Sequence, residues 1–305
     1  MTLVTAPQAP APERDLRGYL LVFFAGVLWS TVGLGIRLID DALVWQILLY
    51  RSLSMSALLY VVIRLRTGRD PLALARASGW GGVIGGLSLV AAYTGGIYAV
   101  QSTSVANAMM LFASAPLLAA VLGRVILREM VRPQTWVAIA VASGGIAIMV
   151  WDKSSGAALR GNLAALGSAL GFAVFTITLR WGKNTEMMPS VFISGLFAIA
   201  IMGGICLWLG LPLVISLPDT SIALGMGVFQ VGAGLVLYTI GSKTVPAAEL
   251  TLLSLAEVVL GPVWVWLVLG ETASINTLIG GAVLLAAIAG NALSGARRKP
   301  PVVIV

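Results

Sequence analysis

The sequence has no histidine, only one cysteine (Cys206) and few charged residues. Without these residues the chain cannot form an internal disulfide or a Cys/His metal site, and we expect no metal or other cofactor. Charged residues make up 10% of the 305 residues, against about 25% in soluble domains. A soluble protein with so few charges could not cover its surface, so lipid must be the solvent for most of this chain.

Long apolar runs dominate what is present, with 59% hydrophobic residues and a mean hydropathy of +0.99. A helix needs about 20 apolar residues, at about 1.5 Å rise each, to cross a bilayer. We therefore predict an all-α integral membrane protein with ten transmembrane helices. Stretches bounded by charges, proline or glycine place them at 18–38, 43–63, 80–100, 104–127, 134–151, 161–182, 190–209, 221–241, 247–269 and 274–294.

The net charge of +7 would suit a nucleic-acid partner, but cytoplasmic loops of membrane proteins carry the same excess of Lys and Arg. We expect a lipid bilayer and no nucleic acid. Asp40, Asp41, Asp219 and Glu271 then fall outside, as do Arg37, Lys153 and Arg160, while Arg51 lies within a span. With both termini cytoplasmic, the inner side of the cytoplasmic membrane collects all but four of the 19 basic residues: Arg14, Arg17, Arg64, Arg66, Arg69, Arg76, Arg124, Arg128, Arg132, Arg180, Lys183, Lys243, Arg297, Arg298 and Lys299.

The two halves of the chain match each other at a nearly constant offset. Gly18 and Arg37 correspond to Gly161 and Arg180 at an offset of 143. Leu127, Glu129, Ala140 and Val141 correspond to Leu269, Glu271, Ala282 and Val283 at an offset of 142. We predict a first repeat at 18–151, a linker at 152–160 and a second repeat at 161–294, between cytoplasmic tails at 1–17 and 295–305.

Each repeat holds five spans, an odd number, so the second five-helix repeat should enter the membrane inverted. Glu129 should then face the cytoplasm and Glu271 the outside. Inverted repeats are typical of alternating-access transporters, because each repeat can adopt the shape of the other and so interchange two gates. Gene duplication without functional symmetry is the alternative.

Motifs in both halves resemble those of a known family. The stretch S-A-P-L-L-A-A-V-L-G-R-V-I-L-R-E ends at Glu129, and L-S-L-A-E-V and V-L-G-E follow in the second half. This pattern over 18–294 resembles the drug/metabolite transporter superfamily, and most closely its EamA-type amino-acid and metabolite exporters. The resemblance implies ten helices around a central cavity and export of amino acids or related solutes. Such families often place proline after the glutamate, where this chain has Val258. The residues that carry the likeness are Pro116, Leu127, Arg128, Glu129, Glu257, Leu269, Gly270 and Glu271.

Pro116 and Pro262 both lie mid-span, in the fourth helix of each repeat. A proline frees the carbonyl four residues earlier, here those of Phe112 and Val258. Interruptions at corresponding places in two halves point to a binding site, so we predict two hinges. A packing kink is the alternative.

Arg51 and Glu257 are the charges deepest in the spans, at ~12 Å and ~18 Å from the outer ends. An isolated charge there costs roughly 2.5 kcal/mol or more, so each needs a partner. They could pair with each other or with backbone carbonyls. Alternatively, they bind the carboxylate and ammonium of a zwitterionic substrate.

Polar stripes on otherwise apolar helices mark faces turned toward a wet or protein interior. Tyrosines near span ends also occur as interfacial residues, which is the alternative for Tyr98. The glycines at 81, 82, 85, 86, 232 and 234 favour close helix approach. With Arg51 and Glu257, the candidate substrate-binding residues are Trp29, Tyr93, Thr94, Tyr98, Gln101, Asn107, Ser114, Gln230, Tyr238 and Ser254.

The leading hypothesis is a secondary transporter, and more narrowly an exporter, of amino acids or related small metabolites. The chain has no Walker pattern for a nucleotide-driven motor. The alternative is an intramembrane enzyme or lipid-handling protein, against which stand the lack of histidine and of a close pair of intramembrane aspartates. The sequence does not indicate an oligomeric state.

Overall fold

The computed structural model describes residues 16–151, 156–181 and 187–296. Nearly all of the predicted tails and about half of the predicted linker lie outside these residues. The same holds for Arg14, Lys153, Lys183, Arg297, Arg298 and Lys299 of the charge count.

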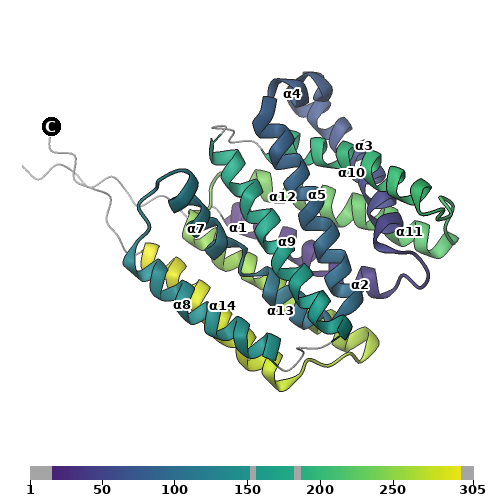
Figure 1. Ribbon diagram of the computed structural model, residues 1–305. Coiled ribbons are helices and arrows are strands. Elements are labelled where there is room, and N and C mark those ends of the chain that lie inside the picture. Colours follow the sequence, from purple (N-terminus) through teal and green to yellow (C-terminus); the bar gives the residue numbers. More distant parts are fainter. Residues whose placement is uncertain (1–15, 152–155, 182–186, 297–305) are drawn as a thin grey trace, which may run out of the picture.

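The described residues form helices and no strand, and ten of the helical stretches are long and apolar enough to cross a membrane. Each lies within a few residues of a predicted span, which confirms the all-α class and the number of spans (Figure 1). Large apolar side chains such as Trp136, Val137 and Ile279 are exposed on the bundle surface, as expected where lipid is the solvent. In chain order the spans are α1 (Leu16–Ser30) with α2 (Val32–Arg37), α3 (Val44–Thr67), α5 (Gly79–Ser102), α6 (Val105–Phe112) with α7 (Ala115–Ile126), α8 (Pro133–Trp151), α9 (Gly156–Trp181), α10 (Met187–Trp208), α11 (Leu217–Gly225) with η1 (Met226–Ala233) and α12 (Gly234–Gly241), α13 (Ala247–Leu269), and α14 (Ile275–Ala296).

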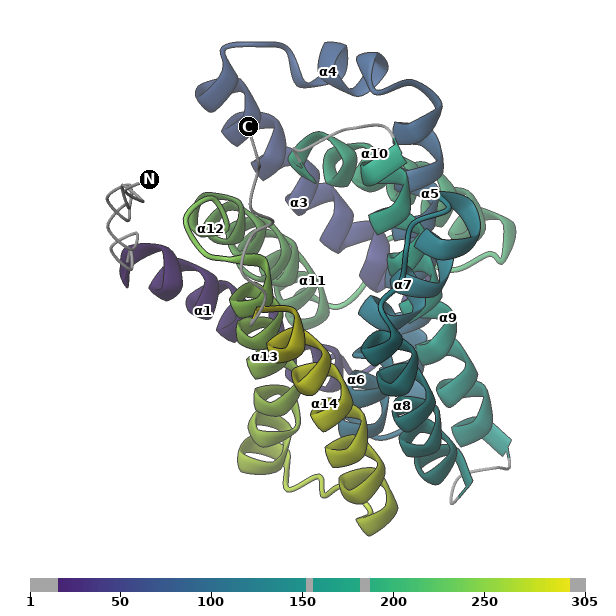
Figure 2. The same cartoon turned by 90° about the vertical axis from the view of Figure 1, so that its left-hand side faces the viewer.

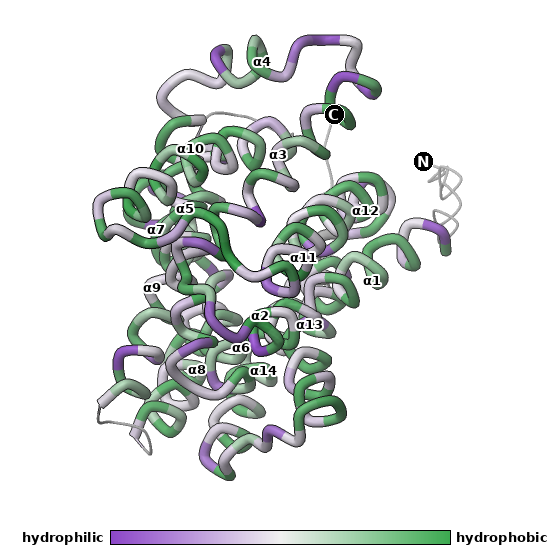
Figure 3. Tube along the Cα trace, turned by 90° about the vertical axis from the view of Figure 1, so that its right-hand side faces the viewer, coloured by the Kyte–Doolittle hydropathy of each residue, from purple (hydrophilic) through white to green (hydrophobic). Residues whose placement is uncertain are grey.

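A short helix that the sequence analysis did not anticipate, α4 (Pro71–Ala77), lies across one end of the bundle (Figure 2). Asp70 caps it by accepting a hydrogen bond from the Leu72 backbone N–H at 3.2 Å, and Pro71 opens its first turn. Hydrophilic residues gather around α4, whereas the spans are mainly hydrophobic along their length (Figure 3). This end of the molecule therefore lies outside the apolar layer.

The main helix contacts between the halves have counterparts in which the roles of the first and second halves are reversed. α5 of the first half packs against α9, and its counterpart in the second half, α12 with η1, packs against α1. α3 packs on its own counterpart α10, and α8 on α14. This exchange supports the predicted repeat.

Corresponding helices also run antiparallel. In α8 and α14, Thr135 donates a hydrogen bond to Asn291 at 2.8 Å, whereas a side chain on Gly280 would meet Met149. In α3 and α10, Gln46 donates to the Pro212 carbonyl at 2.8 Å, so the start of α3 lies beside the segment that follows α10. Antiparallel counterparts are what an inverted repeat requires.

Glycines set the closest helix contacts, as the sequence predicted. A methyl group on Gly85 would lie 2.8 Å from the Thr178 Oγ1 atom, and one on Gly234 would lie 2.4 Å from the Trp29 indole nitrogen. The α8–α14 contact is as tight, because a methyl group on Gly145 would lie 2.6 Å from the Gly280 carbonyl oxygen. A backbone oxygen cannot rotate away as the tip of a flexible side chain can.

Gly145→Ala should therefore destabilise the fold by about 1–3 kcal/mol, the usual cost of overpacking. Its neighbour Gly144 is exposed with open space around it, so Gly144→Ala should stabilise α8 by up to about 1 kcal/mol through helix propensity. Unfolding in detergent, followed by tryptophan fluorescence, measures both. Equal shifts for the two variants would show that α8 and α14 do not meet at Gly145.

Candidate functional site

Pro116 stands where the fourth span is interrupted. α6 ends at Phe112 and α7 begins at Ala115, with Pro116 in the first turn of α7. The Ser114 hydroxyl donates to the Leu111 carbonyl at 2.7 Å and so satisfies a carbonyl at the break. The helix break predicted at this proline is confirmed, and its role as a hinge stays a prediction.

Pro262 does not interrupt its helix, since α13 continues from Ala247 to Leu269. The expectation of matching interruptions at the two prolines is therefore wrong. A proline removes one backbone hydrogen bond, and a helix packed on its neighbours can continue through it. Here the preceding residue, Gly261, lies against Met109 and the Ser30 carbonyl, which hold the chain in place.

Two further irregular segments were missed from the sequence. The first span breaks at Thr31, where Ser30 and Thr31 donate side-chain hydrogen bonds to the Val27 and Leu28 carbonyls, each at 2.7 Å. The eighth span contains the π-helix η1, and π-helical turns are frequent at functional sites. Gln230 of η1 donates to the Thr31 hydroxyl at 2.9 Å, so the two irregular segments meet. The Ser-Thr pair and the four glycines at 225, 227, 232 and 234 are the sequence signals for them.

Arg51 is buried in α3, with 4% of its surface exposed. Its guanidinium carbon lies 4.5 Å from the centre of the Tyr93 ring of α5, a cation–π contact. Within the described part of the chain, no hydrogen bond or ion pair of this guanidinium is found. Gly227 of η1 lets α3 approach, because a methyl group there would lie 2.2 Å from the Arg51 carbonyl oxygen.

Glu257 lies half-buried at the middle of α13, where α13 passes Gly26 of α1. Further along α1, the Trp29 and Tyr238 rings lie 5.3 Å apart, both half-buried. Among the described residues, the Glu257 carboxylate has no hydrogen bond and no ion-pair partner. The proposed pairing of Arg51 with Glu257 is wrong, because the ion pairs found in this part of the chain join other residues.

Four of the remaining candidate substrate-binding residues fall into two groups, half-buried hydroxyls that bond within their own helix and exposed side chains. Thr94 and Ser254 are half-buried and use their hydroxyls within their own helices, on the Val90 and Leu250 carbonyls. Tyr98 is exposed, and Gln101, also exposed, donates to the Ala42 carbonyl at 3.2 Å. The structure thus brings Arg51 to Tyr93 and Trp29 to Tyr238 but does not bring Tyr98 or Gln101 to either pair. Their roles in substrate binding stay predictions.

Asn107 belongs to a fully buried polar cluster. Its amide nitrogen donates to the Asn162 side chain, and its carbonyl oxygen accepts from Thr277 at 3.3 Å. A second, long contact of 3.5 Å runs to the Thr103 hydroxyl. All three partners lie in other spans or at span ends, so the cluster ties α6 to α9 and α14.

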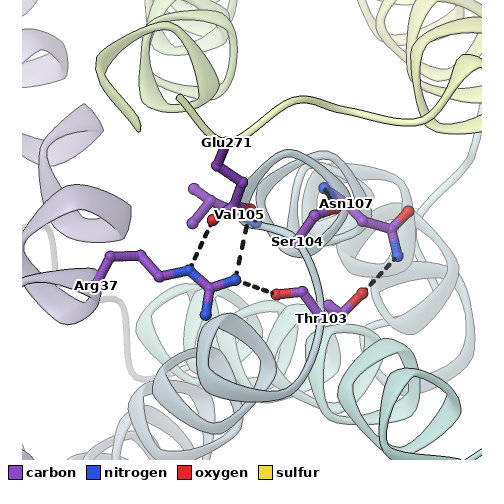
Figure 4. Close-up of polar contacts among 6 residues, drawn as sticks. All are labelled: Arg37, Thr103, Ser104, Val105, Asn107 and Glu271. Carbon is purple, nitrogen blue, oxygen red and sulfur yellow. Dashed lines mark hydrogen bonds and ion pairs between the residues drawn. The ribbon is translucent and has the colours of Figure 1, made fainter. Parts of the chain in front are cut away.

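Two ion pairs lie in the loops that follow the fourth and ninth spans. Arg37 donates to Glu271 at 2.8 Å and to the Thr103 carbonyl at 2.7 Å, and the Arg37 side chain lies between these partners (Figure 4). Arg180 pairs with Glu129. The loops share one backbone shape, with a left-handed residue before each glutamate: Gly270 at φ 69° and Arg128 at φ 55°.

Comparison with known proteins gives the family. The model of the EamA-like transporter family matches residues 16–151 and again residues 159–293, so each half matches by itself. The uncharacterized transporter PA0485 of Pseudomonas aeruginosa is 28% identical over 150 residues, which cover 46% of this chain and 48% of that protein. The match thus spans about half the length of this relative. A solved structure, titled "Crystal structure of protein", aligns with a TM-score of 0.63 and 21% identity over 92% of this chain and 99% of that chain. At this identity it supports the fold alone.

The Arg51–Tyr93 contact makes a prediction about stability. Tyr93→Phe keeps the ring face, whereas Tyr93→Leu removes it and should cost about 2 kcal/mol more, because the pair is desolvated. In an Arg51→Met background this difference should fall by about that amount, which leaves only the difference in packing between Phe and Leu. Unfolding in mixed micelles measures the cycle, and the exposed Tyr98 of the same helix, changed to Phe and to Leu, is the matched control. A difference of undiminished size without Arg51 would contradict the contact.

Proposed function

This chain belongs to the EamA-like transporter family, and from that premise we propose that it is a secondary transporter that exports amino acids or related small metabolites by alternating access. Ten apolar helices and the family make it an integral membrane protein that transports a small molecule. The name of its Pseudomonas aeruginosa relative is also that of a transporter. The finer proposal depends on the charges inside the bundle.

The buried guanidinium of Arg51 carries the proposal. A charge within a span is costly unless a group of opposite charge pairs with it. Among the described residues, the only partner found for the guanidinium is the ring face of Tyr93, which leaves its five N–H donors for a ligand. Their planar fork matches a carboxylate. A substrate that carries a carboxylate group would therefore complete this site.

Glu257 would complement the other end of such a substrate. Its carboxylate lies on α13, and α13 packs against the same helix, α1, that presents Trp29 to Tyr238. A carboxylate together with aromatic faces binds an ammonium group by charge and by cation–π attraction. Gln230 adds a buried side-chain oxygen for which the described residues supply no hydrogen-bond donor. An α-amino acid carries both groups that these residues would bind.

The repeat supports alternating access. Both halves match one family model, and the counterpart helices α3 and α10 run antiparallel, as do α8 and α14. Two such halves can interchange their shapes and expose a site between them to each side in turn. We propose that flux runs outward from the cytoplasm, in line with the exporters that the motifs around Glu129 and Glu271 resemble.

Counterflow in proteoliposomes tests the substrate class. Vesicles loaded with a neutral amino acid should take up the labelled amino acid, whereas the N-acetylated acid and the amino-acid amide should each fail to drive uptake. Each analogue lacks one of the two charges that the site would bind. Equal counterflow by the N-acetylated acid would remove the role of Glu257, and equal counterflow by the amide would remove that of Arg51.

Variants of the two charges test the site itself. Arg51→Ala and Glu257→Gln should each lower the rate of counterflow at least about tenfold, because an unpaired charge on the substrate costs about 1.5–3 kcal/mol. The exposed Arg66 of the same helix gives the control, and Arg66→Ala should transport at the normal rate. Folded yield, read by size-exclusion chromatography, separates a lost site from a lost fold. Normal transport by both folded variants would refute the proposed site.

A further inference from the structure

The two ion pairs, Arg37–Glu271 and Arg180–Glu129, are equivalent contacts related by the internal repeat. Arg37 ends α2 and Arg180 lies in the last turn of α9, and the two arginines are repeat counterparts at an offset of 143. Glu271 and Glu129 are counterparts at an offset of 142. Each pair joins the halves, since Arg37 of the first half holds Glu271 of the second, and Arg180 of the second half holds Glu129 of the first.

The pairs lie at opposite ends of the bundle. Glu271 lies four residues before the first residue of α14, and Glu129 lies four residues before the first residue of α8, whose start lies beside Asn291 near the end of α14. α14 is a full span of the bundle. We name the two ends after their arginines, the Arg37 end and the Arg180 end.

At each end a second hydrogen bond joins the two halves, and the residues of these two bonds are also repeat counterparts. Asn107 donates to Asn162 at the Arg37 end, and Tyr19 donates to Glu249 at the Arg180 end. Tyr19 corresponds to Asn162 at an offset of 143, and Asn107 to Glu249 at an offset of 142. An ion pair and a second side-chain hydrogen bond between the halves thus recur at each end, and the residues of one end are the repeat counterparts of those at the other.

Of the two ion pairs, Arg37–Glu271 has more hydrogen bonds and is less exposed. Arg37 also donates to the Thr103 carbonyl of its own half, which holds the guanidinium in place, and Glu271 accepts the Val105 backbone N–H of the other half at 2.8 Å (Figure 4). The side chains of Arg37 and Glu271 are 27% and 24% exposed, against 45% and 37% for Arg180 and Glu129. Screening by water weakens the more exposed pair.

We propose that the two ion pairs are the gate latches of the transport cycle. Arg37–Glu271 closes the Arg37 end while the substrate site opens at the Arg180 end, and Arg180–Glu129 closes the Arg180 end in the opposite state. This inference rests on the alternating access of the proposed function. The less exposed and better hydrogen-bonded pair, Arg37–Glu271, biases the free protein toward opening at the Arg180 end. That end is the expected cytoplasmic side, where an exporter binds its substrate.

Accessibility of one introduced cysteine tests the latches. Cys206 is the only cysteine and is fully buried, so a Cys206→Ser background with Ser254→Cys reports on the middle of α13. A membrane-impermeant maleimide is applied to each face of oriented vesicles. Glu271→Gln should speed labelling from the Arg37 end about tenfold and slow it from the Arg180 end. Glu129→Gln should do the reverse, by about threefold, because Glu129 has fewer partners.

Asp41→Asn is the matched control, because it removes an exposed negative charge near the Arg37 end and should leave both labelling rates unchanged. The double charge swap Arg180→Glu with Glu129→Arg should restore normal labelling, whereas either single swap should not. The corresponding swap of Arg37 and Glu271 should restore it only in part, since the bonds to Thr103 and Val105 are lost. If Glu271→Gln does not fold, the Glu129→Gln variant and the Arg180–Glu129 swap decide the question.

Shifts of the same sign for Glu271→Gln and Glu129→Gln, or no shift in either, would overturn the proposal. The labelling needs no substrate, so it stays informative if amino acids fail to drive counterflow. Unchanged labelling together with normal amino-acid counterflow would refute the latches and leave the proposed function intact.

Discussion

Inside a bilayer no water replaces a lost hydrogen bond, so a polar group within a span must find its partner in the protein. Most of the polar side chains described above obey this constraint. The hydroxyls of Ser30, Thr31 and Ser114 serve carbonyls at helix breaks, and Asn107 shares a buried cluster with Asn162. The exceptions are few and carry charge or strong polarity, and the functional proposal rests on them.

The features that depend on the length of apolar runs or on the spacing of the repeat, namely the spans and the repeat counterparts, were predicted well from the sequence. Ten spans followed from ten apolar runs, and the offsets singled out Arg37, Arg180, Glu129 and Glu271 before any contact between them was visible. Residue spacing gives the depth of a side chain in the membrane but not the direction in which its helix turns it. Arg51 and Glu257 therefore looked like partners, although Arg51 faces Tyr93 of α5 and Glu257 lies beside α1.

Irregular backbone was harder to predict, because local sequence does not decide it alone. Pro116 and Pro262 have the same chemistry, yet only the first lies at a break, where a serine hydroxyl satisfies a carbonyl. The break at Thr31 and the π-helix η1 face each other through Gln230, so each depends on a partner about 200 residues away in the chain. Structure that depends on contacts between distant residues leaves only weak signals in the sequence, here a Ser-Thr pair and a group of glycines.

The loops before Glu129 and Glu271 trace the same left-handed turn with different residues. Glycine adopts this conformation freely, whereas an L-residue such as Arg128 pays about 1–2 kcal/mol for it. The loop at the Arg180 end therefore has backbone strain at Arg128 that the corresponding loop, with Gly270, does not have. Duplication has left two loops of equal shape and unequal strain, and the strained one carries Glu129, the glutamate with fewer hydrogen-bond partners.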